Sequence, residues 1–374
     1  MKILVDGRSW CKFSAGVGNF FTSAISEWIK QRPSDIFYIL LPKEIDSRTE
    51  LFYHSDNLFL LNYSTLFPRK LPNIFILQLL VPYLCRKLHI DLYYTPVPHL
   101  PYFIPSTTKT IITVHDVVNI EMPHTMSWTN RIATIFCFKQ AITNATYIWA
   151  NSYYTNSKVE EHFRTRFCQN IFIGGAVDRK VFYRRDLSHE EQQNIKQKYG
   201  IKNQFILFVG SLEPRKNLKF LLNIIPELYQ KYEIQLVVVG GKGWKNSDIK
   251  DTILSPSFPK ESTIFCGYIN NEELALLYCC ANCFVSAALM EGLGMPQLEA
   301  LLCGCPIITA HNTAMIEVAK GKDGAYTIED YDRKRWQQTI LNIIREKPTV
   351  NPQQLKDYDW ERIIERLLVY LEII

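Results

Sequence analysis

The chain has 374 residues, more than a single hydrophobic core usually serves, so two domains are expected. Hydrophobic residues make up 47% of it and charged residues 21%, a balance that excludes disordered and fibrous proteins. The net charge of +5 gathers in the first half: residues 1–180 hold 19 Lys+Arg and 13 Asp+Glu, whereas 181–374 hold 23 and 24. This mild basic excess could attract anionic lipid headgroups or an acidic glycan, but without a nucleic-acid motif it does not indicate nucleic-acid binding.

Apolar runs are too short for targeting or membrane-spanning segments. The opening residues carry only Ile3–Val5 before Asp6, shorter than a signal peptide needs. The longest run, 74–84, is interrupted by Gln78 and Pro82, which predicts a buried or interfacial helix. The sequence therefore predicts a cytoplasmic protein, and peripheral attachment at the inner face of the membrane stays open.

The cysteines lie mostly inside apolar runs, which favours free thiols over a disulfide framework. The closest group is Cys279, Cys280 and Cys283, and no second pair stands at the spacing of a zinc finger or ribbon. Packing of small side chains on a helix is favoured over a metal site. The remaining cysteines are Cys11, Cys85, Cys137, Cys168, Cys266, Cys303 and Cys305.

Short β-branched runs alternate with longer amphipathic stretches, the pattern of parallel α/β sheets. In the first half, helices are predicted over 17–31 and 130–143. Strands are predicted at 2–5, 36–41, 58–61, 91–94, 110–114, 147–150 and 170–173.

A polar segment over 181–203 is predicted to be a linker, in which Ser188 and Glu191 have the spacing of a capping box. A second α/β series follows, and a last helix is predicted over 360–371. The pattern predicts two doubly wound domains, 1–180 and 204–355, with 356–374 as a terminal helix. Strands of the second series are predicted at 205–209, 235–239, 263–265, 283–286 and 306–309.

Four loops follow predicted strands, where open α/β sheets bind their ligands. The first runs from Asp6-Gly7-Arg8 through Ser14-Ala15 to Gly16 and Gly18. Its glycine amides could approach a phosphate or form a simple tight turn. In the second loop, His115 precedes Asp116 and could bind a sugar hydroxyl, move a proton or serve a structural role.

The third and fourth loops carry charge. The third delivers Arg215 and Lys216 to the head of a helix, which suits a diphosphate leaving group; a solvated surface pair is the alternative. The fourth places Glu291 and Glu299 around the glycines at 292 and 294, with Pro296 suited to a first helical turn. Glu299 is also favoured there by the helix dipole, whereas no structural reason is evident for Glu291.

Together these loops resemble glycosyltransferase family 4, retaining enzymes of the GT-B fold, in which two Rossmann-like domains face each other across a cleft. The resemblance rests on Glu291 and Glu299, with seven residues between them, and on the Glu-Pro-Arg-Lys-Asn turn at 213–217. Two departures are Ser211, where arginine is frequent, and Gly175-Ala176 before Val177-Asp178, where asparagine-glycine is frequent. Supporting segments are 16–18, 115–116, 151–158, 265–269, 274–278, 303–304 and 316–318.

The resemblance implies that the second domain binds a nucleotide-sugar donor, that the first binds the acceptor, and that the last helix crosses back to the first domain. It implies that Glu299 accepts hydrogen bonds from the ribose, that Glu291 holds hydroxyls of the transferred sugar, and that Arg215 and Lys216 neutralise the diphosphate. The implied catalytic residues are His115, Arg215, Lys216 and Glu291. The implied donor-binding residues are Gly16, Val17, Gly18, Ser211, Arg215, Lys216, Gly292, Leu293, Gly294, Met295 and Glu299.

The 213–217 turn resembles mannosyltransferases of bacterial surface-polysaccharide assembly. This implies transfer of mannose from GDP-mannose, with a UDP-sugar as the next candidate, to a lipid-linked or growing polysaccharide acceptor, as in O-antigen synthesis. No dedicated nucleophile is evident, so front-face attack with retention is expected, without a cofactor or an essential metal. A nucleotide-sugar epimerase or hydrolase and a catalytically silent scaffold stay open. An oxidoreductase is disfavoured because Phe21 interrupts G-x-G-x-x-G.

Overall fold

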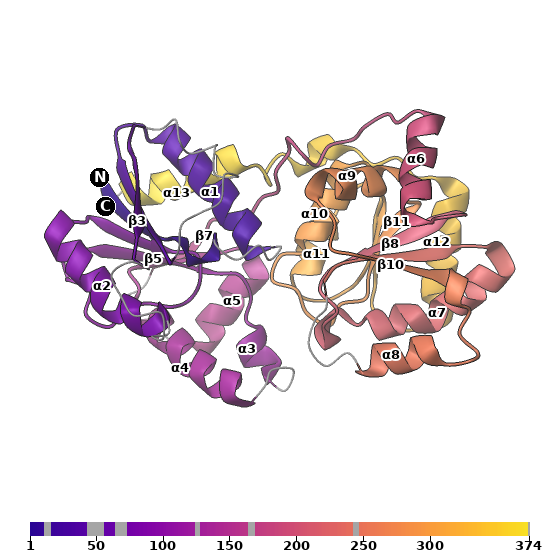
Figure 1. Cartoon of the computed structure of the whole chain (residues 1–374), viewed down its shortest axis with the longest axis horizontal. Helices are drawn as coiled ribbons and strands as arrows, with labels where there is room; N and C mark the ends of the chain where they lie inside the picture. The colour runs from indigo at the N-terminus through magenta and orange to yellow at the C-terminus, as the bar shows by residue number, and fades with distance from the viewer. Residues whose placement is uncertain are drawn as a thin grey trace. The chain divides into compact units, whose positions relative to one another are not determined.

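The computed structural model describes residues 1–10, 16–42, 56–63, 73–123, 128–163, 169–241 and 247–372. The chain divides into two compact units, Met1–Ala176 together with Trp360–Ile374, and Val177–Asp359. Each unit is built on its own parallel sheet (Figure 1). Among the described residues, no helix is long and apolar enough to cross a membrane.

The first unit contains a seven-stranded sheet in the order β3-β2-β1-β4-β5-β6-β7, and all neighbouring strands are parallel. Its strands are short and largely buried, as expected for a parallel sheet covered on both faces. They are β1 (Lys2–Asp6), β2 (Ile36–Leu41), β3 (Leu58–Asn62), β4 (Leu92–Thr95), β5 (Lys109–Val114), β6 (Tyr147–Ala150) and β7 (Gln169–Phe172).

In Figure 1, α1 (Val17–Gln31) and α13 (Trp360–Glu372) lie together on one side of this sheet. The two helices share a core in which Phe20 contacts Trp360 edge-to-face, with ring centroids 4.9 Å apart. The last helix therefore belongs to the first unit, although it follows the whole second unit in sequence. The other helices are α2 (Asn73–Leu88), α3 (Val118–Glu121), α4 (Trp128–Asn144) and α5 (Tyr153–His162).

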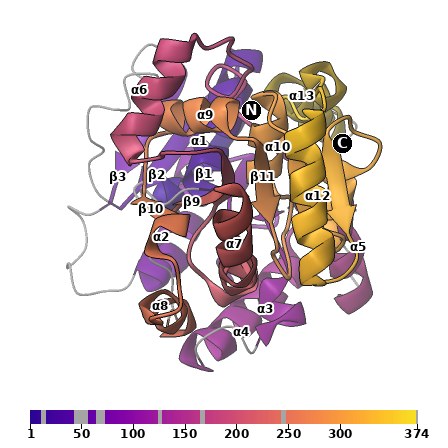
Figure 2. The same cartoon turned by 90° about the vertical axis from the view of Figure 1, so that its right-hand side faces the viewer.

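The second unit contains a six-stranded parallel sheet in the order β10-β9-β8-β11-β12-β13. Its strands are β8 (Phe205–Val209), β9 (Gln235–Val239), β10 (Thr263–Gly267), β11 (Cys283–Ser286), β12 (Ile307–Ala310) and β13 (Ala325–Ile328). Its helices are α6 (His189–Tyr199), α7 (Leu218–Tyr232), α8 (Ser247–Leu254), α9 (Asn271–Cys280), α10 (Met295–Leu302), α11 (Thr313–Ala319) and α12 (Arg333–Glu346), most of them labelled in Figure 2.

Alternation along β8 fills a core on each face of this sheet. Phe205 and Leu207 pack with α6, α9 and α10, whereas Ile206 and Phe208 pack with α7 and α12. Successive strand side chains point to opposite faces, so a continuous apolar run such as 205–209 requires helices on both sides.

The prediction of two doubly wound α/β units is confirmed, and the helix over 17–31 and the strands at 147–150, 205–209, 235–239 and 283–286 have the predicted bounds. The capping box of Ser188 and Glu191 is present at the start of α6. The segment 181–203, predicted as a linker, is part of the second unit, because Phe182, Ile195 and Ile201 are buried in its core. Strand β13 was not predicted: it is an edge strand that buries only Ile328 and lacks a continuous apolar run.

Candidate active site

The strand order of the second sheet reverses between β8 and β11, which pair directly with each other. The connections that follow the two strands run to opposite sides of the sheet at such a point, and this opens a crevice at the carboxyl ends of the strands. The loop over 210–217 follows β8 and the loop over 287–294 follows β11. The fold therefore brings the two charged loops together, although Arg215 and Glu291 stand 76 positions apart in the sequence.

Two acids and two bases from these loops form one ionic cluster. Lys216 Nζ is hydrogen-bonded and ion-paired to Glu291 Oε1, and Arg215 Nη1 lies 3.3 Å from Glu291 Oε2. Arg215 Nε donates to Glu213 Oε2 at 2.9 Å, and Ser211 Oγ donates to Glu213 Oε1 at 2.7 Å. Glu291 therefore has a structural role that the sequence did not suggest, and Ser211 binds a carboxylate of its own loop.

This ionic cluster is largely removed from water. The side chains of Lys216, Glu291 and Arg215 are 11%, 12% and 18% exposed. Burial alone would raise the pKa of Glu291, but Lys216 and Arg215 outweigh it and hold the pKa below its ordinary value. The carboxylate is thus ionised at neutral pH, and the formal charges of the four side chains cancel.

The backbone of the 287–294 loop is fixed by hydrogen bonds. Leu289 N–H donates to the Arg215 carbonyl at 2.7 Å, and Glu291 N–H donates to Thr313 Oγ1 at 3.2 Å. Thr313 has φ +47°, which is unusual for a β-branched residue and indicates local strain. The loop is held on two sides, so the position of the Glu291 carboxylate is set by the fold.

The side chain of Lys216 packs against Gly210, which in turn is packed closely against Gly240. A Cβ on Gly240, at the end of β9, would lie 1.9 Å from the Gly210 carbonyl oxygen, so only glycine fits there. The aliphatic part of Lys216 lies over Gly210, 3.6 Å from where a Cβ would stand. This contact directs the Lys216 ammonium group toward Glu291.

Helix α10 begins directly after the 287–294 loop. Its N-cap is Gly294 in the left-handed region (φ +84°), and Gly292, Leu293 and Gly294 are buried while Met295 is half-buried. The start of a helix favours an anion, but here Pro296 has no N–H, and the Gln297 and Leu298 N–H groups donate to the Gly294 carbonyl at 3.0 and 3.4 Å. Gln297 is buried in this turn, its amide nitrogen 2.9 Å from a Cβ placed on Gly294, and both its polar atoms lack a hydrogen-bond partner among the described residues.

Glu299 was predicted in the first turn of its helix, but α10 begins at Met295, so Glu299 lies beyond that turn and in a different environment. Its Oε2 accepts a hydrogen bond of 3.0 Å from the buried Tyr278 hydroxyl on α9. Burial raises the pKa of Glu299 to about 7, and the Tyr278 bond only partly opposes this rise. The two predicted glutamates therefore differ: Glu291 is a paired carboxylate, and Glu299 is poised between its charged and neutral forms.

In the first unit, Gly16 (φ +88°) is the N-cap of α1, and Val17 and Gly18 open its first turn. Gly18 O accepts a bond from the Thr22 hydroxyl, 2.9 Å away. Ser14 and Ala15 lie outside the described residues.

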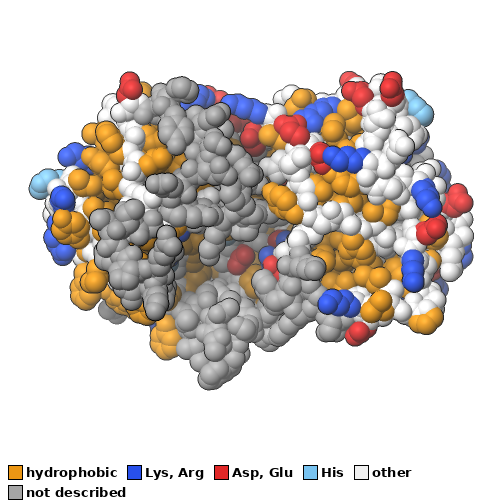
Figure 3. All heavy atoms as spheres, in the orientation of Figure 1, with side chains coloured by type: hydrophobic (Ala, Val, Ile, Leu, Met, Phe, Trp, Pro, Cys, Tyr) orange, Lys and Arg blue, Asp and Glu red, His pale blue; other side chains and the backbone are white. Residues whose placement is uncertain are grey.

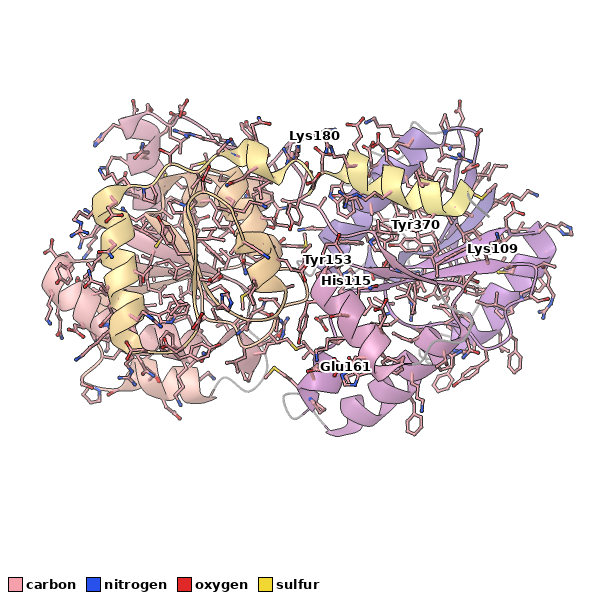
Figure 4. The ribbon with its side chains drawn as sticks, turned by 180° about the vertical axis from the view of Figure 1, so that it is seen from behind. Lys109, His115, Tyr153, Glu161, Lys180 and Tyr370 are labelled. Carbon is pink, nitrogen blue, oxygen red and sulfur yellow. The ribbon has the colours of Figure 1, made fainter. Side chains whose placement is uncertain are left out.

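His115 directly follows β5, and Figure 4 shows it at the opposite end of the strand from Lys109 and close to Tyr153. Its Nε2 lies 2.8 Å from the Pro96 carbonyl, and its Nδ1 lies 2.7 Å from Asn151 Nδ2. A carbonyl only accepts and an amide nitrogen only donates, which assigns the proton to Nε2 of a neutral ring. Burial lowers the pKa of His115, and both ring nitrogens are occupied by protein groups.

Asp6 and Arg8, from the first loop of the sequence, form a buried pair after β1. Arg8 Nη2 donates to Asp6 Oδ2 at 2.7 Å and lies 3.3 Å from His99 Nδ1. Burial, together with the adjacent Arg8 charge, lowers the pKa of His99 to about 4. The pair neutralises itself, which makes it a structural element of the first sheet.

Three residues of the second-unit site were not predicted from sequence: Glu213, Tyr278 and Thr313. Glu213 and Tyr278 stood in segments noted only as family resemblance. Glu213 bonds to Ser211 and Arg215 of its own loop, whereas Tyr278 on α9 bonds to Glu299 on α10. The cysteines of α9 pack as predicted against the core of the second unit, and the eight described cysteines are free thiols. Cys11 and Cys168 lie outside the described residues.

Residues 191–358 match the family model described as glycosyl transferases group 1. This segment, slightly less than half of the chain, is similar to group 1 glycosyl transferases. It contains Arg215, Lys216, Glu291 and Glu299, so the ionic cluster and the head of α10 both belong to it. The resemblance to glycosyltransferases predicted from the loops is confirmed.

Several relatives carry mannosyltransferase names. The chain is 28% identical over 251 residues to the serotype-specific mannosyltransferase WbdA of Escherichia coli, covering 65% of this chain and 30% of that protein. It is 23% identical over 240 residues to the O-antigen chain mannosyltransferase RfbU of Salmonella typhimurium, covering 64% of this chain and 62% of that protein. The match thus spans less than a third of the length of WbdA.

Solved structures with the same fold include Anabaena HepE in complex with UDP and glucose, at TM-score 0.74 and 16% identity over 100% of both chains. WaaG, a glycosyltransferase involved in lipopolysaccharide biosynthesis, matches with TM-score 0.67 and 14% identity over 99% of this chain and 95% of that one. These likenesses cover both units and confirm the predicted GT-B fold.

Proposed function

We propose that this chain transfers a hexose from a nucleotide sugar to a lipid-linked or growing polysaccharide acceptor in surface-glycan synthesis, with GDP-mannose as the first donor candidate. The observation that carries the proposal is the buried cluster of Arg215, Lys216 and Glu291 beside the start of α10. Two fixed cations beside the positive end of a helix suit a departing diphosphate, and a fixed carboxylate suits sugar hydroxyls.

In this proposal Lys216 and Arg215 share their N–H groups between Glu291 and the donor diphosphate. An ammonium group has three donors, and the bond to Glu291 uses one. Glu299 accepts hydrogen bonds from the ribose in its ionised form, and Gly292, Leu293, Gly294 and Met295 contribute backbone amides. Ser211, Gly16, Val17, Gly18 and His115 stay predicted donor-site or catalytic residues.

The comparisons favour two different donors. The mannosyltransferase names of WbdA and RfbU favour mannose, whereas the UDP and glucose in the HepE structure favour a UDP-sugar. WbdA is more similar to this chain in sequence, at 28% identity, than HepE is, at 16%, so GDP-mannose stays first.

The proposed mechanism is front-face attack, in which the leaving diphosphate helps to deprotonate the acceptor and the anomeric configuration is retained. Diphosphate charge is met by Arg215, Lys216 and helix amides, so no essential metal or cofactor is expected. NMR of the product linkage tests retention, and inversion would contradict it. Turnover that is abolished by a chelator and restored by magnesium would contradict metal independence.

Nucleoside diphosphate release from GDP-mannose and UDP-glucose, with and without a lipid-linked oligosaccharide preparation, tests the activity. Release that depends on the acceptor supports transfer. Release at full rate without the acceptor would indicate a hydrolase, and a rearranged sugar would indicate an epimerase. Donor binding without release under any condition would indicate a silent scaffold.

A further inference from the structure

Helix α2 presents apolar side chains on both of its faces. Leu77 and Val81 are fully buried, whereas Phe75, Leu79 and Tyr83 are 63%, 69% and 54% exposed. The three exposed residues are four positions apart and so form one stripe along the helix. A surface helix normally carries polar side chains on its outer face, so an exposed stripe of apolar side chains is unusual.

The loop before β5 extends the same surface. Tyr102 and Phe103 are 66% and 69% exposed. Tyr102 N–H donates to Gln78 Oε1 at 3.0 Å, and Arg86 Nη2 donates to the Phe103 carbonyl at 3.4 Å, so both residues are held against α2. We call this the α2 surface; it consists of Phe75, Leu79, Tyr83, Tyr102 and Phe103. Figure 3 shows hydrophobic side chains gathered where Figure 1 draws α2.

Positive charge borders the α2 surface. Arg86 and Lys87 are exposed at the end of the helix, and Lys87 Nζ lies 5.5 Å from the centre of the Tyr83 ring. Asp91 is the only acidic residue in the sequence from 57 to 115. Exposed aromatic and aliphatic side chains with neighbouring cations match the interface of an anionic bilayer, where rings sit at headgroup level and cations meet lipid phosphates.

We propose that the α2 surface binds an anionic lipid bilayer, with α2 lying in the plane of the interface. The single acidic residue in the sequence from 57 to 115 favours this occupant over a second copy of the chain, which would bring equal positive charge to the same patch. The inference rests on the proposed function in one respect: a lipid-linked acceptor would lie in that membrane. The binding itself is independent of catalysis.

The test is co-sedimentation of the full chain with vesicles of phosphatidylcholine alone, or mixed equally with phosphatidylglycerol. We expect binding to the mixed vesicles that weakens with salt. Phe75→Ser with Leu79→Ser should weaken it at least about tenfold, because two apolar side chains no longer enter the interface. Arg86→Gln and Lys87→Gln should each weaken it about fivefold, and only on the anionic vesicles.

The matched controls are Leu254→Ser and Tyr268→Ser, which remove side chains of the second unit that are 76% and 63% exposed. They should bind like the wild type. Wild type that stays in the supernatant with both vesicles would overturn the proposal, as would equal weakening by the α2 and control variants. A wild-type dimer that Leu79→Ser dissociates, seen by light scattering, would assign the surface to a second copy instead.

Circular dichroism and the melting temperature verify that the α2 variants fold, and Tyr83→Ser alone provides a milder variant with the same expected direction. A donor-induced rise in melting temperature should be unchanged in all of them. If no nucleotide sugar raises the melting temperature of the wild type, the proposed function fails, while the vesicle result still decides the role of the α2 surface.

Discussion

The loops at the carboxyl ends of the two sheets differ in how their polar groups are satisfied. In the second unit, Arg215, Lys216 and Glu291 satisfy one another through side chains. In the first unit, His115 is a neutral ring held by a backbone carbonyl and an amide. The charged cluster that can be shared with a ligand therefore lies in the loops of the second unit, whereas His115 of the first unit is held by groups of its own unit.

The largest expected effect is on the ionic cluster itself. Glu291→Ala leaves Lys216 and Arg215 buried without their shared partner, and removing one member of a buried ion pair costs about 3–5 kcal/mol. Urea denaturation should show this loss in the free energy of unfolding. The control is Glu272→Ala, whose carboxylate pairs with Arg185 but is 63% exposed, and it should cost less than about 1 kcal/mol. Equal losses in both variants would remove the distinction drawn between the loops.

Glu291 and Glu299 should make the stability of the fold depend on pH in opposite ways. The lowered pKa of Glu291 stabilises the fold at neutral pH, and that contribution is lost as pH falls through its folded-state pKa. The raised pKa of Glu299 stabilises the fold below its unfolded value of about 4.3, and that contribution is lost as pH rises toward 7.

Glu299→Gln should therefore gain about 1–2 kcal/mol relative to the wild type at pH above 7, and little near pH 4. Denaturation curves across this range measure the gain. A stability difference independent of pH would show that Glu299 does not carry a raised pKa.

Much of the fold and part of the site could be predicted. The apolar runs at 205–209, 235–239 and 283–286 correctly predicted three strands, because both faces of each strand are buried. The loops at 213–217 and 287–294 were found because each follows such a strand. The ion pairs of Glu291 could not be predicted, since they depend on the direct pairing of β8 with β11.

The predicted linker was misjudged for a related reason. The segment 181–203 is polar on average, and the three apolar side chains that fasten it to the second unit are spread too widely to form a recognisable pattern. The bonds of His115 to Pro96 and Asn151 likewise join three separate strand ends.

A smaller effect is expected at the start of α10. Gln297 is buried with both polar atoms unpartnered, unlike the charged residues beside it. Gln297→Leu should raise the free energy of unfolding by about 1 kcal/mol, because the cost of dehydrating an unpaired amide disappears. In the control Gln337→Leu, which removes bonds to Ile224 O and Glu227, stability should not rise. Destabilisation by Gln297→Leu would mean that the amide has a partner.

The smallest effect is expected at His115, whose protonation we predict to stay unchanged around neutral pH. The lowered pKa should keep the ring neutral, with its proton on Nε2, from pH about 8 down to the ordinary histidine pKa of about 6.5. Nitrogen NMR of the imidazole would show an unchanged pattern over this range. A ring that titrates near its ordinary pKa would show that it is accessible for proton transfer.

The central claim, that the charged loops of the second unit bind a nucleotide-sugar diphosphate, is tested most directly by thermal shift. GDP-mannose and UDP-sugars are compared on the wild type, Lys216→Ala and the exposed control Lys250→Ala, each relative to its own ligand-free melting temperature. We predict that GDP-mannose stabilises the wild type and Lys250→Ala but not Lys216→Ala. Stabilisation by a UDP-sugar alone would change the donor and keep the site, whereas a shift that survives Lys216→Ala, or no shift with any nucleotide sugar, would contradict the account.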